Sequence, residues 1–166
     1  MADIRLEISQ IDRLFTVHAN LLARAAQGEP DADDLAGLGS VLHSFYNGIE
    51  NTILRIAKCY GGQPPEGPRW HRDLLEQMAC ATDARTAVLA PDTAEMLTKY
   101  LGFRHVFRHT YTFFLRWHDL EPLVERLSET WAMVRGELGA FVAGLEAPTC
   151  DEPPTVQVPG GPQDAG

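Results

Sequence analysis

The stretch LEPLVERLSETWAMVRGELGAFVAGL, residues 120–145, carries the most regular hydrophobic pattern of the chain. Large apolar side chains recur in it every three or four residues, which places them on one face of an α-helix. This face consists of Leu120, Val124, Leu127, Trp131, Val134, Leu138, Phe141 and Leu145. Pro122 follows soon after Asp119, and the first turn of a helix tolerates proline. The segment therefore predicts a long amphipathic helix that begins near Asp119.

The same helical spacing recurs upstream, and strand-like alternation of apolar and polar residues is absent. Aspartates at 31, 33 and 34 favour a helix start, where the helix dipole stabilises negative charge. Asp92, with Glu95 three residues later, resembles a capping box at the start of another helix. The pattern predicts an all-α, up-and-down bundle of about five helices. We expect these helices near residues 4–28, 31–60, 70–80, 91–114 and 119–145.

Composition separates the chain of 166 residues into a helical domain, 1–146, and a flexible tail, 147–166, which holds five of the eleven prolines. The net charge of -9 argues against a general nucleic-acid coat or a membrane-surface protein. No apolar run reaches the roughly 18 residues that a membrane span needs, and the N-terminus lacks the apolar run of a signal peptide. Three cysteines without CxxC spacing suit a reducing compartment. We therefore expect a cytoplasmic protein.

One segment inverts the sign of the charge. Residues 99–118, KYLGFRHVFRHTYTFFLRWH, contain no acid but four Lys or Arg residues and three histidines. A solvated basic face is the ordinary explanation for such a run. The interleaved aromatic residues, however, indicate an amphipathic and partly buried segment. Arginine and histidine beside an apolar wall are typical of active sites.

If the segment is one continuous helix, His109 lies about 140° around the axis from Arg104, at about 100° per residue. A single helix therefore does not direct Arg104 and His109 at the same atom, unless a break at Gly102 changes the geometry. Two copies related by a two-fold axis can, each arginine facing the other's histidine. This geometry favours a homodimer, although packing within one chain is an equally open alternative.

The residue types limit the chemistry of this segment. His105 and His109 have the spacing of paired zinc ligands, but the HExxH glutamate is absent and the adjacent arginines repel a cation. We therefore predict no metal and no cofactor. Metal-free phosphodiester cleavage fits better, because histidine can move the 2′-hydroxyl proton and a guanidinium can hold the phosphate. The need for a 2′-hydroxyl makes RNA the expected substrate.

The sequence RHVFRHTY, residues 104–111, resembles the Arg-x4-His-x-Tyr motif of HepT toxins, which belong to the all-α HEPN superfamily. HSFYNG at 43–48 and WHRDLL at 70–75 also resemble the HepT-like branch, so that the resemblance spans about residues 1–145. It implies a dimeric, metal-independent endoribonuclease in which Arg104 and His109 of both subunits meet in one cleft. His105 and Arg108 would support the site or bind RNA phosphate.

The resemblance further implies a minimal nucleotidyltransferase as antitoxin, which would adenylylate the motif tyrosine, Tyr111. An AMP group there would occupy the place that RNA phosphate needs beside Arg104 and Arg108. Two alternatives stay open: a non-catalytic helical partner that regulates a nucleotidyltransferase, and a helical dimer with a basic groove for another anion. The sequence assigns no role to His43, Tyr46 or His71.

Overall fold

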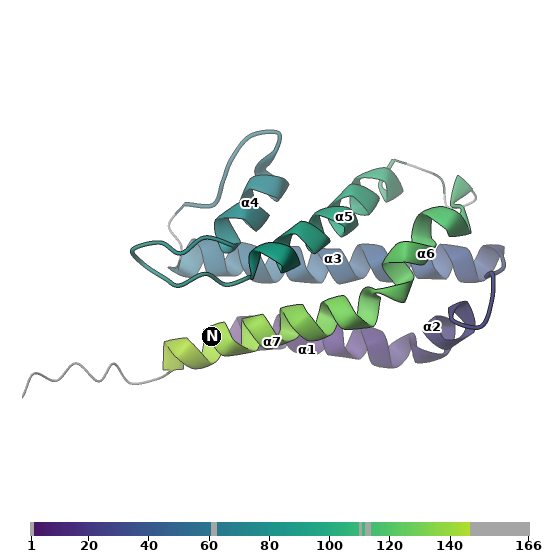
Figure 1. The fold of residues 1–166 in the computed structure, drawn as a ribbon, viewed down its shortest axis with the longest axis horizontal. Helices are drawn as coiled ribbons and strands as arrows, with labels where there is room; N and C mark the ends of the chain where they lie inside the picture. The colour runs from purple at the N-terminus through teal and green to yellow at the C-terminus, as the bar shows by residue number, and fades with distance from the viewer. Residues whose placement is uncertain (1, 61–62, 110, 112–113, 147–166) are drawn as a thin grey trace, which may run out of the picture.

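The computed structural model describes residues 2–60, 63–109, 111 and 114–146, which form seven α-helices and no β-strand (Figure 1). The predicted all-α bundle is confirmed, whereas the predicted tail lies outside the described residues. None of the seven helices combines the length and the apolar character that a membrane crossing requires. The helices are α1 (Ala2–Val17), α2 (Ala19–Ala25), α3 (Ala32–Tyr60), α4 (Trp70–Met78), α5 (Pro91–Phe107), α6 (Trp117–Glu125) and α7 (Leu127–Glu146).

Two of the five predicted helices are each divided by a single residue. His18 separates α1 from α2, although its carbonyl still accepts a helical hydrogen bond from the N–H of Leu22 at 3.0 Å. Arg126 separates α6 from α7. Because α6 begins at Trp117, two residues before the predicted start, Pro122 lies inside that helix rather than in its first turn. Proline removes one backbone donor from the middle of α6.

Helix α3 is the central element of the bundle. It runs along the length of the molecule, with α1 and α7 on one side and α4 and α5 on the other (Figure 1), and it packs against α1, α2, α4, α5 and α6. Burial of apolar side chains is the dominant favourable contribution to folding, and α3 carries many of the buried ones. The fully buried ones include Leu38, Leu42, Phe45, Ile49, Ile53 and Ile56.

The start of α5 is capped from another helix. The predicted capping box of Asp92 and Glu95 is wrong, because the helix is capped at Ala90 and no side chain of its own provides the cap. Glu137 of α7 instead accepts hydrogen bonds from the N–H of Ala90 at 3.1 Å and from the hydroxyl of Thr93 at 2.7 Å. This contact fixes the position of α5 against α7.

The end of α5 differs from the prediction, which continued this helix to residue 114. The helix ends at Phe107, and the helical-wheel geometry therefore does not apply beyond it. The side chains of Phe107 and Leu115 both approach Gly39 of α3, where a Cβ atom would lie 2.7 Å from Cε2 of Phe107 and 2.9 Å from Cδ1 of Leu115. Eight residues of continuous helix would separate them by about 12 Å along the axis. The chain must leave the helix to bring both side chains to Gly39.

Replacing Gly39 by alanine should lower the free energy of unfolding by about 1–3 kcal/mol, because the added methyl group overpacks this contact. Urea denaturation followed by circular dichroism measures the change. Gly136→Ala in α7 is the matched control, since nothing lies within 4 Å of a Cβ atom there. It should be neutral or stabilising by up to about 1 kcal/mol, as helix propensity predicts. Equal effects of the two substitutions would contradict the close approach at Gly39.

Candidate active site

A buried carboxylate joins three helices. The side chain of Glu50, on α3, is only 7% exposed. Its Oε1 atom accepts a hydrogen bond from Nδ1 of His71, on α4. Its Oε2 atom lies 3.2 Å from Nη2 of Arg104, on α5. A buried charge without partners is strongly unfavourable, so this carboxylate requires both neighbours to stay in place.

Arg104 has a second partner on α3, which links it to His43. Its Nε donates to Oδ1 of Asn47 at 2.7 Å, and Nδ2 of Asn47 donates to Nε2 of His43 at 2.9 Å. Burial first, and then the positive charges of Arg104 and Arg108, lower the pKa of His43, against the opposite effect of Glu50. A lowered pKa keeps the imidazole neutral, as its role as hydrogen-bond acceptor requires.

These side chains share one face of α3, because the spacing from 43 to 47 and 50 is helical. Tyr46 lies in the same region, fully buried, and its hydroxyl has no hydrogen-bond partner in the described part of the chain. Burial and the charge of Glu50 raise the pKa of Tyr46 well above its ordinary value, so the phenol stays neutral. Sequence reasoning missed Asn47 and Glu50. The available signal was their polarity within the otherwise apolar face of a long helix.

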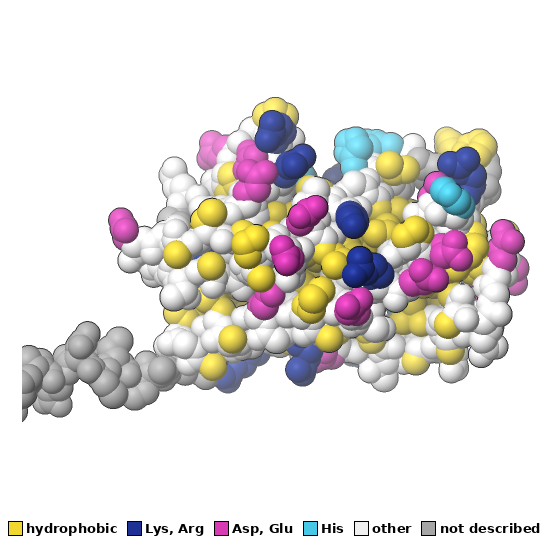
Figure 2. All heavy atoms as spheres, viewed as in Figure 1, with side chains coloured by type: hydrophobic (Ala, Val, Ile, Leu, Met, Phe, Trp, Pro, Cys, Tyr) yellow, Lys and Arg dark blue, Asp and Glu magenta, His cyan; other side chains and the backbone are white. Residues whose placement is uncertain are grey.

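The structure separates the residues of the predicted motif. Arg104 points toward α3 and is 13% exposed, whereas His109 lies exposed in the turn after α5. The rings of His105 and His109 lie 5.2 Å apart, edge to face, and Figure 2 shows histidine side chains gathered at the edge of the molecule above the end of α5. Arg108 caps α5 and is exposed, and Tyr111 is 71% exposed. Among the described residues, the hydrogen bonds of the Arg104 side chain go to α3, and none joins it to His109.

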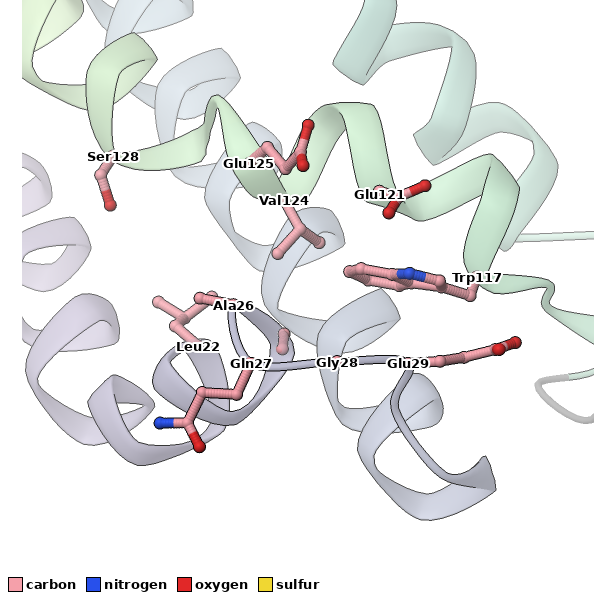
Figure 3. A pocket seen from close by; sticks show the side chains of 11 residues that line it. Leu22, Ala26, Gln27, Gly28, Glu29, Trp117, Glu121, Val124, Glu125 and Ser128 are labelled. Atoms are coloured by element: carbon pink, nitrogen blue, oxygen red, sulfur yellow. The ribbon is translucent and has the colours of Figure 1, made fainter.

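A large hollow elsewhere on the molecule has the wrong charge for an RNA phosphate. It measures about 810 Å³ and lies between α6 and the residues that follow α2 (Figure 3). Trp117 lies in it together with the carboxylates of Glu29, Glu121 and Glu125. These carboxylates would repel a phosphate, and neither Arg104 nor His109 lines this hollow. The candidate site is therefore the polar cluster of His43, Asn47, Glu50, His71 and Arg104.

The described residues contain no group of three or more His, Cys, Asp or Glu side chains arranged to hold a metal ion. In the polar cluster, Glu50 is the only carboxylate, and the guanidinium of Arg104 already lies against it. A cation at this carboxylate would compete with Arg104 and His71. The cluster is built to hold an arginine and an imidazole in fixed orientation.

Comparison with known proteins identifies one family. The family described as HepT-like protein matches residues 37–145. This range extends from α3 into α7 and contains the whole polar cluster, together with His109 and Tyr111. No curated protein and no solved structure matches the chain.

The pKa of His43 should lie below its ordinary value of 6.5, because burial and two nearby arginines disfavour the imidazolium. The unfolded chain then binds a proton that the folded chain does not. The free energy of unfolding should therefore fall as the pH drops below about 6.5 and level off below the folded-state pKa. NMR titration of the histidine ring protons measures the pKa, and urea denaturation measures the stability.

Arg108→Gln should raise the pKa of His43 toward its ordinary value, because it removes one of the two positive charges. Arg116→Gln is the control, since Arg116 pairs with Asp119 and is not among the charges that act on His43. A pKa of His43 at or above 6.5 in the wild-type protein would contradict its burial beside Arg104 and Arg108.

Proposed function

Because the chain belongs to the HepT-like protein family, we propose that it is a metal-independent endoribonuclease toxin, paired with a nucleotidyltransferase antitoxin. One observation supports this most directly. The arginine of the motif is held rigidly by two side chains of α3, while the histidine and the tyrosine of the motif are exposed in the segment that follows α5.

In the proposed reaction, Arg104 binds the scissile phosphate and stabilises the charge that develops on it. Its Nε and Nη2 atoms are engaged by Asn47 and Glu50. Of its five N–H donors, the others remain for phosphate oxygens. Because Asn47 and Glu50 already fix the guanidinium, its remaining N–H groups are oriented before the phosphate binds. Donors that need no reorientation stabilise the transition state more effectively. His109 moves a proton between RNA and solvent as a general acid or base.

We propose a homodimer because, among the described residues, Arg104 is directed at α3 while His109 lies exposed in the turn after α5, and no hydrogen bond joins them. A second copy would bring its His109 to the phosphate on Arg104, and two such sites would lie about the two-fold axis. His105 and Arg108, both exposed near the end of α5, would bind flanking phosphates. RNA would then meet positive charge from both chains at one groove, although the chain as a whole is acidic.

Tyr111 is the proposed site of adenylylation by the antitoxin. At 71% exposed it can reach a second protein, unlike Tyr46 and Tyr100, which are buried. AMP on this tyrosine would add a phosphate and a base close to Arg108, and repulsion would oppose the binding of RNA phosphate there.

A second candidate is a non-catalytic partner that regulates the nucleotidyltransferase. The observation that favours it is the pairing of Arg104 with Glu50. The carboxylate offsets the positive charge of the guanidinium, so the pair as a whole attracts a phosphate weakly. In that case the cluster would be structural, and the exposed segment around Tyr111 would be the docking surface.

The purified protein should cleave single-stranded RNA in the presence of EDTA, and induction should arrest growth. His109→Ala should lower the cleavage rate by about 10²–10⁴-fold, the usual contribution of a general acid or base. His118→Ala is the matched control, since the side chain of His118 is 94% exposed and belongs to α6. Gel analysis of labelled RNA measures the rate. Intact RNA and normal growth with the wild-type protein would favour the regulatory alternative.

Incubation with the cognate nucleotidyltransferase and ATP should add the mass of at least one AMP to the wild-type protein. Tyr111→Phe should stay unmodified, because it lacks the acceptor hydroxyl. Tyr60→Phe, at a partly exposed tyrosine at the end of α3, is the control and should be modified like the wild type. Intact-protein mass spectrometry reads the result. Modification of Tyr111→Phe to the wild-type extent would place the acceptor elsewhere.

A further inference from the structure

We propose that His71 is a second proton-transferring histidine of the site, the general base that activates the 2′-hydroxyl of RNA beside Arg104. This inference rests on the proposed nuclease function and extends it to a residue outside the Arg-x4-His-x-Tyr motif. The site would then hold two histidines of different origin: His71, fixed in the polar cluster, and His109, on the exposed turn.

The contact with Glu50 sets which nitrogen of the neutral His71 ring carries the proton. The carboxylate accepts a hydrogen bond from Nδ1, so in the neutral ring the proton sits on Nδ1 and the lone pair on Nε2. The same contact holds the ring in one orientation, with Nε2 on the side away from Glu50. Trp70 stacks on the ring with centroids 3.7 Å apart, which fixes the plane of the imidazole. Such a ring is oriented as a base.

The base and the phosphate-binding group are neighbours. His71 and Arg104 contact the two oxygens of the same carboxylate, so their side chains lie on adjacent sides of Glu50. The side chain of His71 is 24% exposed. Its Nε2 has no hydrogen-bond partner in the described part of the chain and is not one of the buried unpaired atoms there. Solvent, and therefore a substrate hydroxyl, can reach it.

The other histidine of the cluster serves as an internal contrast. Nε2 of His43 accepts a hydrogen bond from Asn47, and its Nδ1 is buried without a partner among the described residues. Burial and the arginines lower the pKa of His43, which makes it a poor base. Of the two histidines in the polar cluster, His71 is the one that combines a carboxylate partner with an accessible nitrogen.

The step balances without a metal or a redox partner. A phosphate of RNA binds the available N–H groups of Arg104, and Nε2 of His71 takes the proton of the adjacent 2′-hydroxyl. The 2′-oxygen forms a bond to phosphorus as the bond from phosphorus to the 5′-oxygen breaks. The leaving 5′-oxygen takes a proton from protonated His109 of the second copy. The products are a 2′,3′-cyclic phosphate and a 5′-hydroxyl; His71 then releases its proton to water, and His109 takes one up from water, which restores both side chains.

His71→Asn separates the chemical role of His71 from a structural one. The asparagine amide can still donate to Glu50 from nearly the same place as Nδ1, so that Arg104 keeps its position, but no base remains at Nε2. We expect kcat for RNA cleavage in EDTA to fall about 10²–10⁴-fold, with KM within about twofold of the wild type. His118→Asn is the control and should retain wild-type kcat.

The outcomes separate the two proposals. Wild-type kcat in His71→Asn, with His109→Ala inactive, would overturn the role of His71 and leave the nuclease function standing. Failure of the wild type to cleave RNA would overturn the nuclease function.

A binding experiment on the wild-type protein tests the position of His71 without catalysis. It applies even if His71→Asn does not fold. Adding 3′-AMP to the wild-type protein should shift the NMR signals of the His71 ring, and Arg104→Gln should abolish that shift. No shift in the wild-type protein would overturn the placement of His71 beside a bound phosphate.

Discussion

The buried carboxylate of Glu50 is the constraint on which the arrangement of α3, α4 and α5 depends. Apolar contacts between helices tolerate small shifts, because one methyl group can replace another at similar free energy. A carboxylate that is 7% exposed does not, since loss of Arg104 leaves its charge uncompensated in a poorly hydrated interior and loss of His71 leaves one of its oxygens without a hydrogen bond. Arg104 must therefore approach from α5 and His71 from α4. The apolar core holds the bundle together, and the contacts of Glu50 specify how α4 and α5 are placed against α3.

The same placement explains why the motif divides in space. Arg104 is drawn inward by Glu50 and Asn47, while Phe107 and Leu115 pack at Gly39 and force the chain out of helix α5. Residues immediately after Phe107 are then directed away from the core. An arginine and a histidine that are five positions apart in sequence thus acquire different surroundings. One becomes a rigid buried group, and the other lies on an exposed turn that can meet a second molecule.

Local pattern predicted the helices and the motif, but not the partners of Arg104. The regular spacing of apolar residues in α3 can be recognised in a window of a few residues, because helical periodicity is a local property. The ends of this helix, at Ala32 and Tyr60, can be predicted in the same way. The pairing of Glu50 with Arg104 joins positions 54 apart, and no local spacing reports it. The end of α5 at Phe107 differs from the prediction for the same reason. Apolar spacing continues past Phe107, and the contact that ends the helix lies at Gly39 of another element.

The charge balance of the site bears directly on how it would recognise RNA. In a chain with a net charge of -9, long-range attraction of a polyanion is weak. Glu50 further offsets the charge of Arg104, so the proposed recognition of a phosphate there would depend on hydrogen-bond geometry rather than on field strength. In the proposed reaction, a carboxylate that weakens attraction but fixes the guanidinium and orients an imidazole would favour the transition state over the ground state. Differential stabilisation of this kind is what catalysis requires. A surface selected only for tight RNA binding would instead leave the arginine unpaired and exposed.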